Sequence, residues 1–159
     1  MFRIPSLFVS LAIVALAGSV AFAQAPNQSA ESAAASDNIL HVHLVGLRNS
    51  NGQVHCTLFN DANAFPGDDD HALRDTDGPI KDNAGTCDFK SLAPGAYALV
   101  VFHDENGNGK FDQNFLGIPQ EGYGFSNNAH PRFSAPKFSD CSFDYKGGEL
   151  TLTIKMIYW

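Results

Sequence analysis

Oxygen-bearing side chains recur at alternate positions in one short segment of this sequence. Asp104, Asn106 and Asn108 are each separated by one residue, a glycine follows, and Asp112 completes the series. Carboxylate and amide oxygens in this order, with glycine at the sixth position for a sharp turn, are typical of a calcium loop. We predict a calcium site formed by these four side chains and the main-chain carbonyl of Lys110, which occupies the seventh position.

The loop departs from an EF-hand at its closing position. An EF-hand ends with a bidentate glutamate at position twelve, where this sequence has Phe115. Glu105 or Glu121 could complete the shell if the intervening chain folds back. The neutral Asn ligands predict weak affinity, at about the millimolar to sub-millimolar level of extracellular modules. The alternative is a turn-rich loop whose Asp and Asn side chains cap their own backbone.

The elements that must position this loop have the pattern of strands. Apolar residues alternate with polar ones over residues 40–45 and 54–58, and Asn51-Gly52 between them predicts a hairpin turn. The run from Tyr97 to Phe102 is apolar throughout, as in a strand covered on both faces. Further strands are predicted near residues 87–89, within 133–145, and over 150–159. With no amphipathic helix, this pattern indicates a single antiparallel β-sandwich.

The first 23 residues have the three parts of a secretory signal peptide. Arg3 provides the positive charge, residues 7–20 are almost wholly apolar, and Ala21-Phe22-Ala23 is a small-x-small cleavage site. The alternative is an uncleaved membrane anchor, but the apolar run is shorter than the roughly 18–20 residues that a spanning helix needs. We therefore predict a protein that is periplasmic or secreted, without stable membrane insertion after cleavage.

Two further segments follow the predicted cleavage site. Residues 24–37 are rich in Ala, Ser, Gln and Asn and lack a core-forming period, which predicts a disordered leader. Residues 38–159 have the length of one domain. Without Arg3 the chain has nine basic and 17 acidic residues, a formal charge of −8. This balance disfavours nucleic acid and anionic membranes as partners.

Three cysteines in an exported chain suggest one disulfide and one remaining thiol. Cys56 and Cys87 bracket a long segment rich in aspartate, which we expect to be a solvated loop. We predict a Cys56–Cys87 bond. Cys141 lies in a later predicted strand, where it could be buried and free. The alternative is three buried thiols.

Three histidines offer an alternative metal site. His41 and His43 point to one face of a predicted strand, and a hairpin could set His55 opposite His43. Three imidazoles on one face could hold Cu²⁺ or Zn²⁺ in a periplasmic metal-binding protein. They could equally be half-exposed strand residues on a solvent face.

An enzyme acting on envelope glycans or peptides is a further alternative. It would use His103, Asp104, Glu121 and His130, but the sequence has no nucleophile and base at a recognised spacing. We therefore expect binding without catalysis.

The loop that follows the calcium motif carries aromatic residues. Tyr123 and Phe125, with Glu121 and Asn127, are the candidate binding surface for an unidentified protein or glycan of the cell envelope. The aromatic side chains could instead fold over the end of the sandwich as a small satellite core.

A long signature in this region resembles a known bacterial family. His103–Lys110 continues into Gly117–Asn128, and Pro136, Phe138 and Asp140 follow at fixed spacing. This pattern is similar to that of the exported bacterial family called domain of unknown function 2141. The family has no established activity, so the resemblance implies a fold and export but no role.

A second, local resemblance covers about a quarter of the domain. Leu92–Tyr97, the apolar strand and the Asp-x-Asn-x-Asn-Gly loop are similar to prealbumin-like B repeats of bacterial surface adhesins. The resemblance implies an immunoglobulin- or prealbumin-like sandwich of about seven strands with calcium in the loop. The sequence therefore predicts an exported, non-enzymatic β-sandwich whose structural calcium loop shapes a binding surface.

Overall fold

The computed structural model describes residues 38–131 and 134–159, and the predicted signal peptide and leader lie outside these residues. The elements of the described chain are β1 (Ile39–Val45), β2 (Gln53–Phe59), β3 (Arg74–Gly78), β4 (Ile80–Lys81), β5 (Ala84–Lys90), β6 (Gly95–Asp104), β7 (Tyr123–Phe125), α1 (Phe138–Cys141), β8 (Phe143–Tyr145) and β9 (Glu149–Lys155), with 3-10 helices at Asp69–His71 and Ser126–Asn128.

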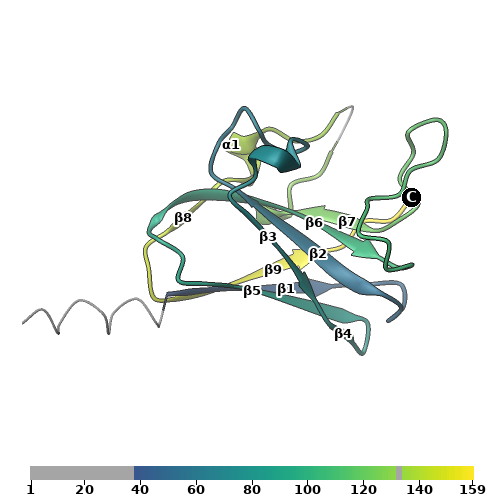
Figure 1. Ribbon diagram of the computed structural model, residues 1–159, viewed down its shortest axis with the longest axis horizontal. Coiled ribbons are helices and arrows are strands. Elements are labelled where there is room, and N and C mark those ends of the chain that lie inside the picture. Colours follow the sequence, from purple (N-terminus) through teal and green to yellow (C-terminus); the bar gives the residue numbers. More distant parts are fainter. Residues whose placement is uncertain (1–37, 132–133) are drawn as a thin grey trace, which may run out of the picture. The chain divides into compact units, whose positions relative to one another are not determined.

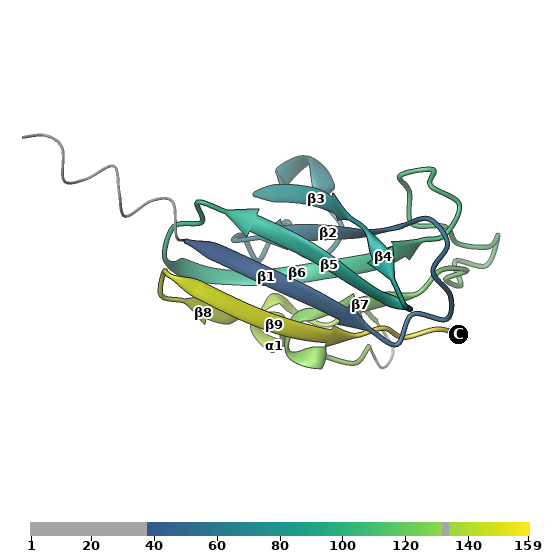
Figure 2. The same cartoon turned by 90° about the horizontal axis from the view of Figure 1, so that it is seen from below.

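The strands form two sheets that face each other (Figures 1 and 2). One sheet has the order β4-β5-β1-β9, and the other has the order β3-β2-β6-β7, with β8 paired to the start of β6. The predicted all-β sandwich is confirmed. The pairing is mainly antiparallel, as predicted, and β9 with β1 is the one parallel pair among the described strands. The described residues contain nine strands rather than about seven, since the acidic segment contributes β3 and β4.

The predicted hairpin at Asn51-Gly52 does not exist, because β1 and β2 belong to different sheets. Gly52 is required for another reason. Its φ is +65°, and a Cβ placed there would lie 1.9 Å from the carbonyl oxygen of Asp104. The glycine thus lets the connection between the sheets pass close to the end of β6, where the predicted calcium loop begins.

The main core fills the space between the two sheets. The alternation predicted for β1 places Leu40, Val42 and Leu44 inward with no exposed surface. From the other sheet, Val54 and Leu58 belong to the same core cluster. Each side chain of this size contributes about 1.5–3 kcal/mol when it is fully buried.

The second face of β6 is also covered, as its continuous apolar sequence predicted. A separate cluster on this outer face includes Phe59, Phe65 and Phe125, with Phe102 packed against it. The rings of Phe59 and Phe65 meet edge to face at 5.5 Å between centroids. Because this aromatic cluster packs against residues around 64–65, 123–129 and 138–141, it fixes those segments to the sheet.

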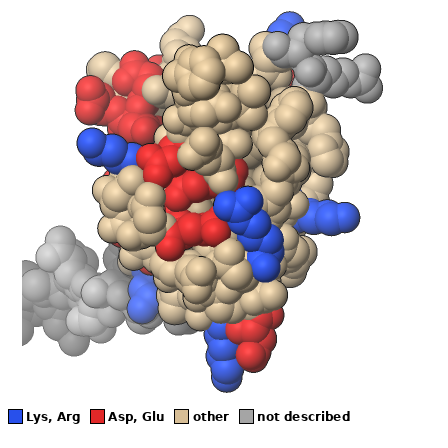
Figure 3. All heavy atoms as spheres, turned by 90° about the vertical axis from the view of Figure 1, so that its right-hand side faces the viewer, with Lys and Arg blue, Asp and Glu red and all other residues tan. Residues whose placement is uncertain are grey.

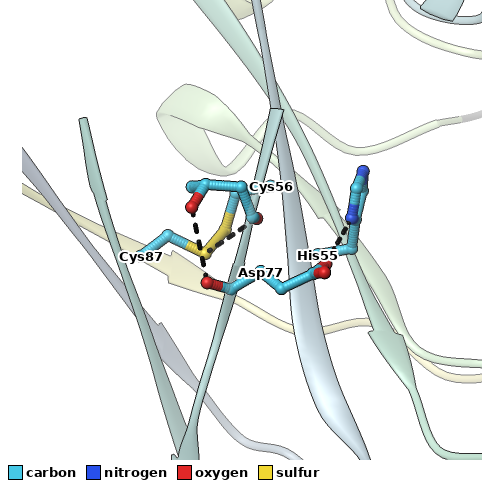
Figure 4. The surroundings of a disulfide bond; sticks show 5 residues. His55, Cys56, Asp77 and Cys87 are labelled. Carbon is cyan, nitrogen blue, oxygen red and sulfur yellow. Dashed lines mark hydrogen bonds and ion pairs between the residues drawn. A yellow bond between two sulfur atoms is a disulfide. The ribbon is translucent and has the colours of Figure 1, made fainter. Parts of the chain in front are cut away.

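A disulfide joins the two sheets through the core. Cys56 on β2 bonds to Cys87 on β5, and both residues are buried (Figure 4). On the strand next to β2, Asp77 pairs with His55 at 2.6 Å. The predicted pairing is confirmed, and a disulfide is compatible with an oxidising compartment.

The third cysteine is buried and free, which was one of the possibilities considered, but the strand predicted around it is wrong. Cys141 ends the one-turn helix α1, and among the described residues of the expected strand region only 143–145 form a strand. Burial raises the pKa of the Cys141 thiol to about 11. The thiol is therefore protonated at neutral pH and weakly nucleophilic.

Reduction of the disulfide will destabilise the domain. The bond closes a loop with a sequence separation of 31, and its loss restores about 3–4 kcal/mol of unfolded-state entropy in the chain-entropy model. Urea unfolding with and without reductant measures this difference. An unchanged free energy of unfolding in the reduced protein would contradict the expectation.

Ser126→Ala will also destabilise the domain, because one buried hydroxyl joins three elements. Ser126 Oγ accepts the Leu99 N–H at 2.9 Å and donates to the Cys141 carbonyl at 2.6 Å, with no exposed surface. Its loss leaves two buried backbone groups without a partner, at a cost of about 1–3 kcal/mol in urea unfolding. The exposed control Ser139→Ala should change stability by less than about 0.5 kcal/mol.

Candidate functional site

The oxygen-rich loop begins at a buried carboxylate at the end of β6. Asp104 has no exposed surface. Its Oδ1 accepts the Asn108 N–H at 3.0 Å, and its Oδ2 accepts the Gly109 N–H at 2.9 Å. These bonds wrap the loop around the carboxylate. Oδ2 also accepts the Gln53 side-chain amide at 3.4 Å, so Oδ1 is the oxygen that retains a lone pair for another interaction.

The other predicted side-chain ligands are joined to one another by hydrogen bonds within the same loop. Asn106 Nδ2 lies 2.7 Å from Asp112 Oδ2, and Asn108 Nδ2 lies 3.1 Å from the same oxygen. The Asn108 Oδ1 accepts the Lys110 N–H at 2.8 Å. The two amides turn their donors toward the carboxylate of Asp112, and rotation of each amide would turn its oxygen there instead.

Glu121 folds back onto this loop, as considered from the sequence. The side chain is 4% exposed. One carboxylate oxygen accepts the Glu105 N–H and the other accepts the Asp112 N–H, both at 3.1 Å. Burial, with the nearby charges of Asp112 and Asp104, raises the pKa of Glu121. The carboxylate thus joins the beginning and the end of the loop.

Phe115, the residue at the position of the EF-hand glutamate, points away from this arrangement and is 95% exposed. It lies in a tight turn that the Asn114 side chain holds by accepting the N–H groups of Leu116 and Ile118 at 2.9 and 3.0 Å. The chain thereby reverses direction and brings Glu121 back to the loop, although Glu121 lies beyond the twelve residues that an EF-hand loop would span.

A polar network supports the loop from behind, and sequence reasoning missed two of its members. His103 is fully buried, with Nε2 2.8 Å from the Asn51 carbonyl oxygen and Nδ1 2.7 Å from the Tyr158 hydroxyl. Arg48 lies over the Tyr158 ring at 5.0 Å and pairs with Glu105 at 2.6 Å. Arg48 and Tyr158 were not predicted to contact the loop because they lie far from it in the sequence.

The Arg48 pair also determines the charge state of Glu105. Burial alone would raise its pKa, but hydrogen bonds from Asn49 and Arg48 and the guanidinium charge outweigh burial, so the pKa of Glu105 is lowered. This end of the molecule therefore carries several carboxylates close together. Figure 3 faces it and shows Asp and Glu gathered beside a few Lys and Arg residues.

The predicted binding surface is not an exposed platform. Tyr123 and Phe125 are 8% and 6% exposed and pack edge to face at 6.0 Å. They form the satellite core that was the alternative. Asn127 is exposed, but its amide donates to the Ser142 carbonyl at 2.8 Å and thus ties two segments together.

The predicted histidine face does not form. His41 and His43 lie on β1 and His55 lies on β2, in the opposite sheet. His41 and His55 instead pair separately with Asp88 and Asp77. In the described part of the chain, no three His, Cys, Asp or Glu side chains are arranged to hold a metal ion.

The residues of the enzyme alternative have structural partners. His103, Asp104 and Glu121 are buried in the contacts described above. His130 is exposed and lines a separate cavity with Lys137 and Asp140. None of the helices described is long and apolar enough to cross a membrane.

The fold and this loop define a class of small β-sandwich domain, held by an inter-sheet disulfide, with an oxygen-rich loop at one end. A family model described as an uncharacterized protein conserved in bacteria, DUF2141, matches residues 42–153. The chain belongs to this family. Comparisons with curated proteins and with solved structures gave no match.

Glu121→Ala should loosen both ends of the loop. Without the carboxylate, the Glu105 and Asp112 amides lose their acceptor, so hydrogen exchange at these two positions should accelerate by about tenfold or more, as local opening becomes easier. The control Glu149→Ala removes the same charge from an exposed site on β9. Equal exchange rates in both variants would contradict the conclusion that Glu121 holds the two ends of the loop together.

Proposed function

We propose that this protein is an exported binding domain in which calcium, held by the Asp104–Asp112 loop, fixes the surface that contacts a component of the cell envelope. The observation that supports the proposal is a set of hydrogen bonds that joins Asp104, Asn106, Asn108 and Asp112 within one loop. Glu121 connects the beginning and the end of this loop.

The chemistry of these side chains supports calcium over a transition metal. Asp112 and Glu121 add carboxylates to that of Asp104, and the asparagine amides can present oxygen after rotation. A set of hard oxygen donors without imidazole or thiolate suits Ca²⁺. Amide and main-chain oxygens would have to supply part of the shell, including the carbonyl of Lys110.

A cation would also relieve a specific electrostatic problem. Burial is the main cause of the raised pKa of Glu121, and the charges of Asp112 and Asp104 add to it, so the three carboxylates repel one another. A divalent cation bound by the loop would replace this repulsion with attraction, and binding would require these side chains to rearrange, since no three of them surround one point in the described part of the chain. It would stiffen the chain from the end of β6 to the start of β7.

Export and the absence of catalysis are parts of the same proposal. The signal-like first 23 residues and the Cys56–Cys87 bond support an oxidising compartment outside the cytoplasm. The structural contacts of His103 and Glu121 support binding over catalysis, because both side chains serve to hold the loop.

Calcium should raise the melting temperature of the purified protein. At 10 mM Ca²⁺ and a Kd of about 0.1–1 mM, linkage gives about 1.4–2.7 kcal/mol of stabilisation. For a domain of this size, that corresponds to a shift of roughly 5–10 °C in a thermal melt. The shift should be absent with Mg²⁺, which holds its water more firmly.

Asp104→Ala should remove this shift, and the exposed control Asp75→Ala should retain it. Because Asp104→Ala also removes loop contacts, isothermal calorimetry on the folded variant must accompany the melt. Failure of 10 mM Ca²⁺ to stabilise the wild-type protein would refute the calcium site.

A further inference from the structure

A cavity of about 370 Å³ lies beside the loop, and the described residues that line it are uncharged, with four aromatic side chains among them. Phe111, Tyr123, Phe125 and Trp159 line it, together with the polar side chain of Gln113. The volume is within the range of small-ligand sites, about 300–1,000 Å³. We propose that this cavity, here called the aromatic trough, binds an uncharged glycan.

Trp159 is the side chain that makes the trough suitable for a sugar. It is 80% exposed, yet its indole N–H donates to the Tyr123 hydroxyl at 2.9 Å. The hydrogen bond orients a large apolar ring that remains open to solvent. Sugar rings present faces of C–H groups, which pack on the negative face of an aromatic ring.

The floor of the trough is rigid before any ligand arrives. The rings of Phe111 and Tyr123 meet edge to face at 5.8 Å, and Tyr123 meets Phe125 in the same way. Tyr123 and Phe125 are almost fully buried. A preformed aromatic floor reduces the entropy that binding must overcome.

Charge argues for a neutral ligand. The described residues that line the trough include no Lys, Arg, Asp or Glu. The neighbouring loop is acidic, and Figure 3 shows Asp and Glu concentrated on this end of the molecule. An anionic polymer would be repelled, and a cationic ligand would find no carboxylate in the trough itself. Gln113 and the Tyr123 hydroxyl offer neutral hydrogen bonds suited to sugar hydroxyl groups.

The backbone beside the trough argues against an extended peptide that adds a strand. β7 lies at the edge of its sheet, but Tyr123 already exchanges both of its backbone hydrogen bonds with Ile157, at 3.0 and 2.8 Å. A peptide would therefore find no free strand edge there. A proline-rich peptide needs no such edge, and it serves as the competing ligand in the test.

The inference rests on the proposed function in one respect: Phe111, one wall of the trough, belongs to the calcium loop. A second and smaller cavity of about 160 Å³ shares Phe111, Tyr123 and Phe125 with the trough. The aromatic surface thus continues past a single sugar-sized site, which fits an oligosaccharide.

The test uses the intrinsic fluorescence of the protein, because Trp159 is its single tryptophan. The probes are neutral tetrasaccharides of β-1,4-linked N-acetylglucosamine, β-1,4-linked glucose and α-1,4-linked glucose, and a decaproline peptide. We expect at least one tetrasaccharide to shift the emission to the blue and to reduce acrylamide quenching at least about twofold, as burial of the indole requires. Acrylamide is chosen because it is uncharged and insensitive to the acidic surroundings.

Calorimetry with the responding tetrasaccharide then compares variants. Trp159→Ala should weaken binding by about tenfold or more, and Tyr123→Phe, which frees the indole, by about threefold to tenfold. Phe115→Ala removes an exposed aromatic ring that does not line the trough, and it should bind as the wild type does. Unchanged affinity in Trp159→Ala would overturn the proposal.

Two further outcomes would also overturn it. No response to any tetrasaccharide at 10 mM excludes a neutral glycan site, and saturable binding of decaproline alone assigns the trough to a peptide. These results are independent of the calcium test, since Trp159→Ala should keep the calcium-dependent melting shift. Conversely, a wild-type protein that binds the sugar but not calcium would support the glycan site and refute the proposed calcium site.

Discussion

The arrangement of this end of the molecule depends on the complete burial of the Asp104 carboxylate. A charge removed from water must be compensated by hydrogen bonds, since an isolated buried carboxylate would cost several kcal/mol or more. The loop amides of Asn108 and Gly109 provide this compensation. To reach the carboxylate, the chain must turn sharply after β6, and this turn presents the oxygens of the following residues to one another.

The end of β6, from which the loop starts, is also held in place by specific contacts inside the sandwich. The Asp104 carbonyl lies against Gly52, and the preceding His103 is fixed between the Asn51 carbonyl and Tyr158. Gly122 completes the support, because a Cβ there would lie 2.3 Å from the Tyr158 ring. The loop is therefore set by contacts from three distant parts of the chain. A local sequence motif thus acquires its position from the fold, and Glu121, which joins its two ends, lies outside the motif.

The parts of the fold that follow from local periodicity could be predicted from sequence. The alternation in β1 and β9, the apolar run of β6 and the Cys56–Cys87 pair indicated a two-layer β-sandwich and its disulfide. Pairing partners could not be predicted, because alternation specifies which face is buried but not which strand lies alongside. Hence Asn51-Gly52 was taken for a hairpin, although its glycine serves a close approach between sheets, and His55 was placed beside His43.

In the candidate site, too, the local features could be predicted and the contacts between distant residues could not. The residue types and spacing of the oxygen-rich loop could be recognised in the sequence, and Glu121 could be named as a further candidate because only a chain reversal was needed to bring it there. The burial of Tyr123 and Phe125 was left open, since the sequence does not state what covers an aromatic residue in a loop. Arg48 and Trp159 had no local signal, because their roles depend on contacts with Glu105 and Tyr123 that lie far away in sequence.

The trough and the loop share Phe111, so their binding energies should be coupled, and the size of the coupling has a limit. If calcium only orders the loop, it can strengthen ligand binding by no more than the inverse of the ordered fraction without calcium. A loop that is about 10% ordered allows roughly tenfold, or 1.4 kcal/mol. The hydrogen bonds to Asp104 and Glu121 already order the loop without an ion, which keeps that fraction high. Calcium should therefore modulate the trough modestly and act chiefly on the stability of this end of the sandwich.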